Sequence, residues 1–116
     1  LHLHAVVAQE LLAGALGREG RRRIHDWLIE PFDRRDRVVV PDRRAWSRSG
    51  EMISELVELG DLGPGGFSRS FTNDALIAAS LREVGAILIT RNVRDFTLLS
   101  RVESFSFEAP WPGMKG

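Results

Sequence analysis

Three acidic residues occupy positions from which they could bind a cation together. Glu10 follows the apolar opening of the chain, Asp95 follows the apolar run 86–90, and Asp74 opens the segment that leads into that run. In parallel α/β sheets ligands bind beyond the carboxyl ends of the strands, so polar residues just after a strand are the first functional candidates. Carboxylates suit a hard divalent cation such as Mg²⁺ or Mn²⁺, which polarises a phosphodiester and activates water.

Each acid also has a purely structural interpretation. Glu10 could be a solvated helix residue, Asp74 a favourable anion at a helix N-terminus, and Asp95 a turn former. Taken one at a time, these interpretations are favoured over catalysis. A joint role predicts that the three carboxylates converge in space.

The first part of the sequence predicts a strand followed by helices. Residues 1–7 alternate and then become continuously apolar, which is typical of a strand entering a sheet, and residues 9–16 continue as a helix. A second helix is expected over 19–33, with Pro31 ending or kinking it. Residues 38–40 are a short apolar run that fits either a strand or an extended loop.

The middle of the chain predicts a helix and a turn. Asp42 is a candidate N-cap for a helix that stops at Gly60. The glycines of segment 60–66 lack the Gly-Lys-Ser/Thr ending of a phosphate-binding loop, so this segment is expected to be a linker.

The last part of the chain predicts half of an α/β unit. Thr72 or Asn73 is expected to cap a helix that ends at Gly85, and residues 86–90 are expected to form a fully buried parallel strand. Residues 102–107 alternate like an edge strand, and the remainder is a tail.

Two of these segments resemble a known family. Asn73-Asp74-Ala75-Leu76-Ile77-Ala78-Ala79-Ser80, followed by Thr90-Arg91-Asn92-Val93-Arg94-Asp95-Phe96, is similar to the signature of PIN-domain ribonucleases, most closely the VapC toxins of bacterial toxin–antitoxin pairs. The resemblance implies metal-binding roles for Asp74 and Asp95. It implies a third acid at Glu10, because Gln9-Glu10-Leu11-Leu12-Ala13-Gly14 matches the family's glutamate-bearing helix.

The resemblance also implies a wider site, a fold and partners. Thr90 and Asn92 match the polar companions of the acids, and in some members the acid lies at the position of Asn92. The implied fold is a three-layer α/β domain with a mostly parallel central sheet, spanning residues 1–116 as one partial domain. The implied activity is Mg²⁺- or Mn²⁺-dependent RNA hydrolysis by a homodimer, with a cognate VapB-type antitoxin whose peptide fills the site.

PIN domains begin with a strand that ends in the first catalytic aspartate, followed by a helical hairpin. Neither precedes Leu1, and the only methionines are Met52 and Met114. We therefore expect an N-terminally truncated chain, with one strand and two helices encoded upstream. Two alternatives follow: an inactive PIN remnant that binds RNA or antitoxin, or an unrelated flavodoxin-like regulatory domain. The second should carry a late lysine beside the acids, and the sole lysine, Lys115, lies in the tail.

Composition limits the class of protein. Among 116 residues there is no cysteine, which excludes disulfide scaffolds, zinc fingers, iron–sulfur clusters and thiol nucleophiles. A reducing, cytoplasmic location fits, and no apolar run is long enough to cross a bilayer. The 16 basic residues cancel the 16 acids, but residues 18–48 carry an excess of arginine and residues 49–108 an excess of acid. The arginines at 21–23 and 34–35 could contact RNA phosphates or form a solvated surface.

Two weaker patterns are left open. His2 and His4 have the spacing of two ligands on one strand face, as in some zinc sites, although a half-exposed strand is the default interpretation. Trp27, Trp46 and Trp111 could stack on nucleobases, and burial in the core is the favoured interpretation.

Overall fold

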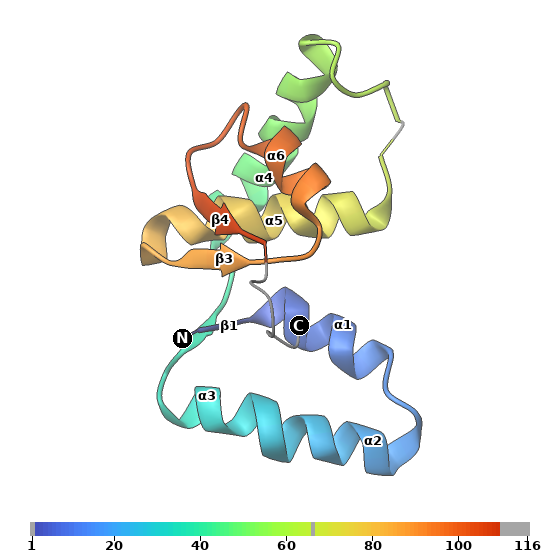
Figure 1. Ribbon diagram of the computed structural model, residues 1–116, viewed down its shortest axis with the longest axis vertical. Coiled ribbons are helices and arrows are strands. Elements are labelled where there is room, and N and C mark those ends of the chain that lie inside the picture. The colour runs from blue at the N-terminus through green and yellow to red at the C-terminus, as the bar shows by residue number, and fades with distance from the viewer. Residues whose placement is uncertain (1, 66, 110–116) are drawn as a thin grey trace. The chain divides into compact units, whose positions relative to one another are not determined.

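The computed structural model describes residues 2–65 and 67–109, so Leu1 and the tail with Trp111, Met114 and Lys115 lie outside the described residues. The chain divides into two compact units, residues 1–40 and 41–116. Each unit contains helices and one pair of parallel strands (Figure 1). The parallel α/β class predicted from the sequence is therefore confirmed, with the described strands arranged as two separate pairs.

The first unit is a parallel strand pair connected by helices. Strand β1 (Leu3–His4) pairs with β2 (Val38–Val39), which identifies the apolar run 38–40 as a strand. Between them come α1 (Ala5–Ala13), α2 (Gly17–Ile24), the π-helix η1 (His25–Ile29) and α3 (Glu30–Arg34).

The opening strand is shorter than the sequence predicts, because a histidine starts the first helix. The Nδ1 atom of His4 accepts a hydrogen bond from the Val6 amide at 3.0 Å and caps α1. Histidine is not among the common capping residues, and β-branched Val6 and Val7 favour a strand, so the local sequence gives little sign of this start. The prediction of a strand over 1–7 is wrong beyond His4.

His4 does not form the zinc site considered above. Its side chain is buried, burial lowers its pKa to about 4, and His2 is exposed. Among the described residues, no group of three or more histidine, aspartate or glutamate side chains is arranged to hold a metal ion. The role of His4 is to cap α1.

Pro31 does not end the second helix. The chain stays helical from Gly17 to Arg34, and the π-helical turn lies immediately before the proline. There the Glu30 amide bonds to the His25 carbonyl, five residues back. A π-turn widens the helix where proline removes a donor and crowds the preceding carbonyl, so it accommodates the ring without breaking the helix.

The second unit is built on two long helices. Helix α4 (Arg43–Glu58) packs on α5 (Arg69–Val84), which also contacts α6 (Val93–Leu99), as Figure 1 shows. The Oδ1 atom of Asp42 accepts from the Ala45 amide at 2.8 Å, which confirms the predicted N-cap. The core between these helices is apolar and its most deeply buried large side chains are Met52, Leu56, Phe96 and Leu99.

The strand pair of this unit is more exposed than predicted. Strand β3 (Ile87–Ile89) pairs in parallel with β4 (Ser106–Glu108), in the register Ile87 to Ser106. The strand predicted over 86–90 is confirmed as β3, but full burial is wrong because Ile87 is 58% exposed. The strand predicted over 102–107 is wrong for residues 102–105, which form a turn and an irregular segment before β4 begins at Ser106. The rings of Phe105, just before β4, and Phe107, within it, contact the ring of Phe96 on α6 and join the strand pair to that helix.

An arginine joins α4 to the segment between α6 and β4. The Arg48 guanidinium donates to Glu55 at 2.8 Å, to Glu103 at 3.2 Å and to the Val102 carbonyl at 2.5 Å. The hydrogen bond with Glu55 raises the pKa of Arg48 most, and Glu103 raises it further. Because Glu103 is buried, this arginine compensates a carboxylate that water reaches poorly.

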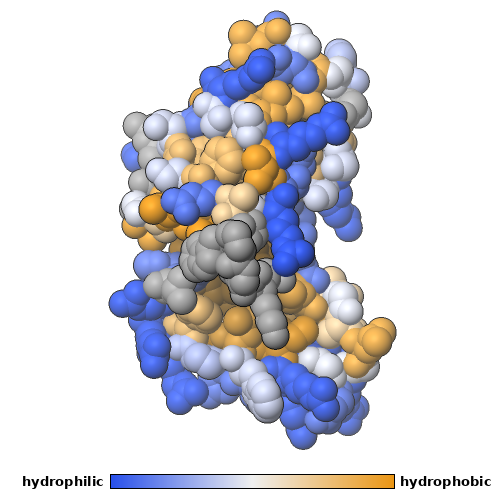
Figure 2. Space-filling model, in the orientation of Figure 1, coloured by the Kyte–Doolittle hydropathy of each residue, from blue (hydrophilic) through white to orange (hydrophobic). Residues whose placement is uncertain are grey.

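The two tryptophans within the described residues are not core residues. Trp27 is 83% exposed and Trp46 is 61% exposed, so the prediction that they are buried is wrong. On the face drawn in Figure 2, hydrophobic side chains reach the surface of each unit among hydrophilic ones. Within the described residues, no helix has the length and apolar character needed to span a bilayer.

Candidate metal centre

Asp74 lies well inside helix α5. The Oγ atom of Ser68 accepts from the Phe71 amide at 3.0 Å, so α5 begins earlier than the predicted caps Thr72 and Asn73. Asp74 therefore lies beyond the first turn of α5. The helix dipole has little effect at that position, so the interpretation of Asp74 as a helix-terminal anion is wrong. The residue is only 9% exposed. A carboxylate buried on the core side of a helix needs polar partners.

The loop after β3 supplies one such partner. The Thr90 hydroxyl accepts from the Asn92 amide at 3.0 Å and holds the loop in a local turn before α6 begins at Val93. Asparagine at a helix start commonly caps the helix with its side chain. Asn92 makes no such capping bond, so its side-chain amide is directed to other groups.

The Asn92 side chain connects two of the predicted acids. Its Nδ2 donates to Asp74 Oδ2 at 2.6 Å and to Asp95 Oδ2 at 2.9 Å. These residues come from α5, the loop after β3 and the first turn of α6. The structure thus brings Asp74, Asn92 and Asp95 together, with Thr90 shaping the loop; we call Asp74 and Asp95 the acid pair.

The geometry of the acid pair suits a small hard cation. Bonds of 2.6 Å and 2.9 Å to a single nitrogen keep the two Oδ2 atoms no more than 5.5 Å apart. At that separation two full charges repel by at least about 3 kcal/mol at an effective dielectric of 20. The partial positive charge of the Asn92 amide offsets this repulsion. Mg²⁺ is usually held by one or two carboxylates, with water and phosphate oxygens completing its octahedron. Two converging carboxylates fit that requirement.

Glu10 lies in the other unit of the chain. It is on helix α1 and its side chain is exposed. Its solvated position agrees with the structural interpretation given above. Its convergence with the acid pair remains a prediction.

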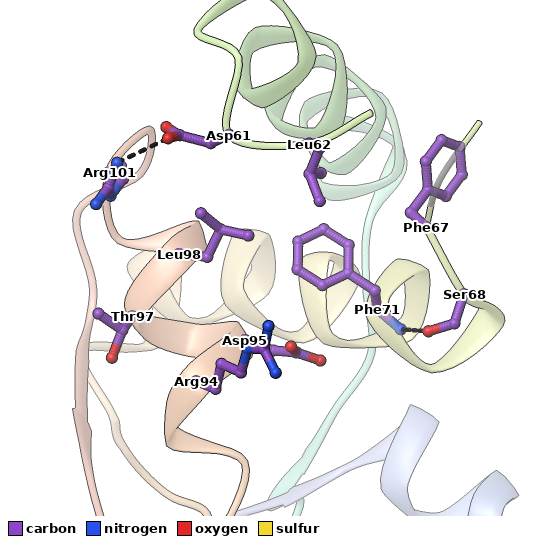
Figure 3. A pocket seen from close by; sticks show the side chains of 10 residues that line it. All are labelled: Asp61, Leu62, Phe67, Ser68, Phe71, Arg94, Asp95, Thr97, Leu98 and Arg101. Carbon is purple, nitrogen blue, oxygen red and sulfur yellow. Dashed lines mark hydrogen bonds and ion pairs between the residues drawn. The ribbon is translucent and has the colours of Figure 1, made fainter. Parts of the chain in front are cut away.

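A groove beside the acid pair was not predicted from the sequence. It has a volume of about 530 Å³ and lies between the end of α4, the start of α5 and α6 (Figure 3). Asp95 lines it, together with Arg94, Phe67 and Phe71. Arg94 stands next to Asp95 in the matched loop signature, which is the one sequence signal that could have drawn attention to it.

Comparison with known proteins identifies the fold family. The model of the PIN domain matches residues 1–102. The chain belongs to the PIN domain family. The match overturns the flavodoxin-like alternative. No curated protein matches the chain.

Two solved structures share the fold of this PIN domain. One is the structure of FitAB bound to an IR36 DNA fragment, with a TM-score of 0.67 and 17% identity over 98% of this chain and 76% of that chain. The other is VapBC-1 from nontypeable Haemophilus influenzae, with a TM-score of 0.60 and 23% identity over 94% of this chain and 73% of that chain. At these identities the likeness concerns the fold.

Proposed function

We propose that this PIN domain is a divalent-cation-dependent ribonuclease of the VapC toxin type, in which Asp74 and Asp95 hold Mg²⁺ or Mn²⁺. The observation that carries the proposal is the shared hydrogen bonding of Asn92 to both carboxylates. Family membership supports a nuclease, and the acid pair supplies the oxygen ligands that such a nuclease needs. Glu10 is proposed as the third acid.

The residues of the site have separable tasks. Asp74 and Asp95 would hold the cation, which supplies a polarised phosphoryl oxygen and an activated water for RNA hydrolysis. Asn92 keeps the two carboxylates turned toward one point, and Thr90 fixes the Asn92 backbone. Burial of Asp74 limits competition from bulk water and strengthens its interaction with a cation.

Partners follow from the same proposal. The similarity to VapBC-1 supports a VapB-type antitoxin as the cognate partner. We further propose that a peptide of this antitoxin fills the site and that the active assembly is a homodimer. Binding of an antitoxin peptide over the acid pair would block RNA and cation together. Size-exclusion chromatography coupled to light scattering measures the assembly directly.

RNA cleavage tests the proposed activity. Purified full chain should cleave a structured RNA in Mg²⁺ or Mn²⁺ and not in EDTA. Asp74→Asn keeps an acceptor oxygen for Asn92 but removes one charge, so it should fold at least as stably without Mg²⁺ and lose cleavage. Asp33→Asn is the matched control, because Asp33 is exposed on α3. Cleavage by Asp74→Asn at the wild-type rate rejects Asp74 as a metal ligand.

A further inference from the structure

The two carboxylates of the acid pair come from different parts of the second unit. Asp74 belongs to α5, which packs on α4. Asn92 and Asp95 belong to the segment 90–108, which contains α6 and β4 (Figure 1). The separation of the two carboxylates therefore depends on how the segment 90–108 is held against α4 and α5.

One hydrogen bond closes the segment 90–108 on itself. The Thr90 amide donates to the Glu108 carbonyl at 2.9 Å, so the loop that carries Asn92 is bonded to the end of β4. Between these ends the chain runs through α6 and a turn at residues 100–103. A displacement of this turn is therefore passed to the loop from both sides, through α6 and through β4.

Arg48 anchors the turn to α4. Its guanidinium donates to the Val102 carbonyl at 2.5 Å and to Glu103 at 3.2 Å. Two carboxylates on α4 orient the guanidinium, with Glu55 at 2.8 Å and Glu51 at 3.8 Å. The Glu103 side chain is only 7% exposed, so breaking its pair with Arg48 would leave a buried charge without that compensation.

The other contacts of this region are less able to fix its position. Arg101 pairs with Asp61 at 2.8 Å (Figure 3), but its side chain is 60% exposed, and exposed ion pairs contribute little. The buried side chains of Phe96 and Leu99 hold α6 in the core, but apolar packing is non-directional. The planar guanidinium of Arg48 bonds in fixed directions and can set the position of the turn.

We propose that Arg48 is a remote positioning residue of the metal centre, which sets the place of the segment 90–108 and so keeps the Asn92 amide in reach of both carboxylates of the acid pair. The inference rests on the proposed function, because it concerns the same acid pair. It adds a residue that lies outside the sequence motifs of the site. Arg48 acts through the turn at residues 100–103 and takes no part in binding the cation.

The Asn92 side-chain amide can report its own position without any metal. The sequence contains two asparagines and one glutamine, so the NMR spectrum of the isotope-labelled full chain has three side-chain amide pairs, from Gln9, Asn73 and Asn92. Asn92→Ala removes one pair and thereby assigns it. In EDTA, Arg48→Ala should shift the Asn92 signals toward those of the exposed Gln9. Arg48→Lys keeps the charge but lacks the planar fork, so it should shift them partway.

Two control variants separate positioning from loss of stability. Arg101→Ala removes the exposed arginine at the same turn, and Asp42→Ala removes the N-cap of α4 and lowers stability without touching the segment 90–108. Both should keep the wild-type Asn92 signals. In Mg²⁺ titrations, Arg48→Ala should bind about tenfold more weakly than the wild type and both controls.

Wild-type Asn92 signals in Arg48→Ala would overturn the proposal. An equal shift in Asp42→Ala would also overturn it, because any destabilisation of α4 would then suffice. If Arg48→Ala does not fold, Arg48→Lys decides by the same signals. If the Asn92 signals move in the Arg48 variants alone but the wild type binds no Mg²⁺, the proposed ribonuclease fails, while the role of Arg48 in placing the Asn92 amide stands.

Discussion

Replacing Asn92 by alanine should destabilise the free protein and increase its response to divalent cations. The substitution removes the donor that bonds to both carboxylates of the acid pair, at 2.6 Å and 2.9 Å. Hydrogen bonds to charged groups contribute about 1.5–3 kcal/mol each, and partial exposure of Asp95 lowers the total, so we expect a loss of about 2–3 kcal/mol. For a chain of this length that corresponds to a melting temperature lower by roughly 10 °C.

Added cation should stabilise Asn92→Ala more than it stabilises the wild type. In the wild type a cation must displace the Asn92 amide from between the carboxylates, whereas in Asn92→Ala that amide is gone and the repulsion between the two charges is greater. A cation at about ten times its dissociation constant stabilises a folded protein by about 1.4 kcal/mol. The rise in melting temperature on adding Mn²⁺ should therefore be larger for Asn92→Ala than for the wild type.

Thermal melts in EDTA and in a series of Mn²⁺ concentrations provide the assay. Asn73→Ala is the matched control, because Asn73 lies beside Asp74 on α5 and makes no side-chain hydrogen bond with other described residues. Its melting curve should follow the wild type at every Mn²⁺ concentration. Equal stability of Asn92→Ala and wild type in EDTA, or an equal Mn²⁺ response, would refute the reasoning.

Two further predictions concern stability. Arg48→Ala should cost about 3 kcal/mol in urea unfolding, because the buried Glu103 loses its ion pair with Arg48, and an unchanged urea midpoint would contradict this. His4 has a folded-state pKa of about 4 against 6.5 unfolded, so its neutral form contributes stability above pH 6.5 that is lost as the pH falls toward 4. His4→Asn keeps a capping side chain and should remove up to about 3 kcal/mol of this pH dependence, whereas the exposed His2→Asn should not.

Local signals in the sequence predict helices α4 and α5 of the second unit, whereas no helix was predicted where α6 forms. Asp42 has a strong capping side chain, and Gly85 adopts φ +63°, a conformation that glycine reaches without strain. The start of α4 and the end of α5 were therefore predicted correctly, because a capping side chain or a glycine fixes each of them. The start of α5 was missed because Ser68, Thr72 and Asn73 are all good caps, and tertiary packing of Phe71 decides between them.

The resemblance to the family predicted Asp74 and Asp95 as site residues. It did not predict that the Asn92 side chain donates a hydrogen bond to both of them. Nothing in the spacing of Asp74 and Asp95 shows that one amide donates to both, since that depends on how the loop after β3 meets α5. The exposure of Trp27 was missed for a related reason. Its helical spacing fits a core position, but the π-turn at residues 25–29 shifts the phase of the helix by one residue.

Direct measurement of cation binding tests the central claim most sharply. Isothermal titration calorimetry with Mn²⁺ on the full chain, in the absence of RNA, compares the wild type with Asp74→Asn and with the control Asp33→Asn. The acid pair predicts saturable binding by the wild type and the control, and at least about tenfold weaker binding by Asp74→Asn, since one of two carboxylate ligands is lost. Equal Mn²⁺ affinity in Asp74→Asn and wild type, or no binding by the wild type at millimolar Mn²⁺, would contradict a metal centre at Asp74 and Asp95.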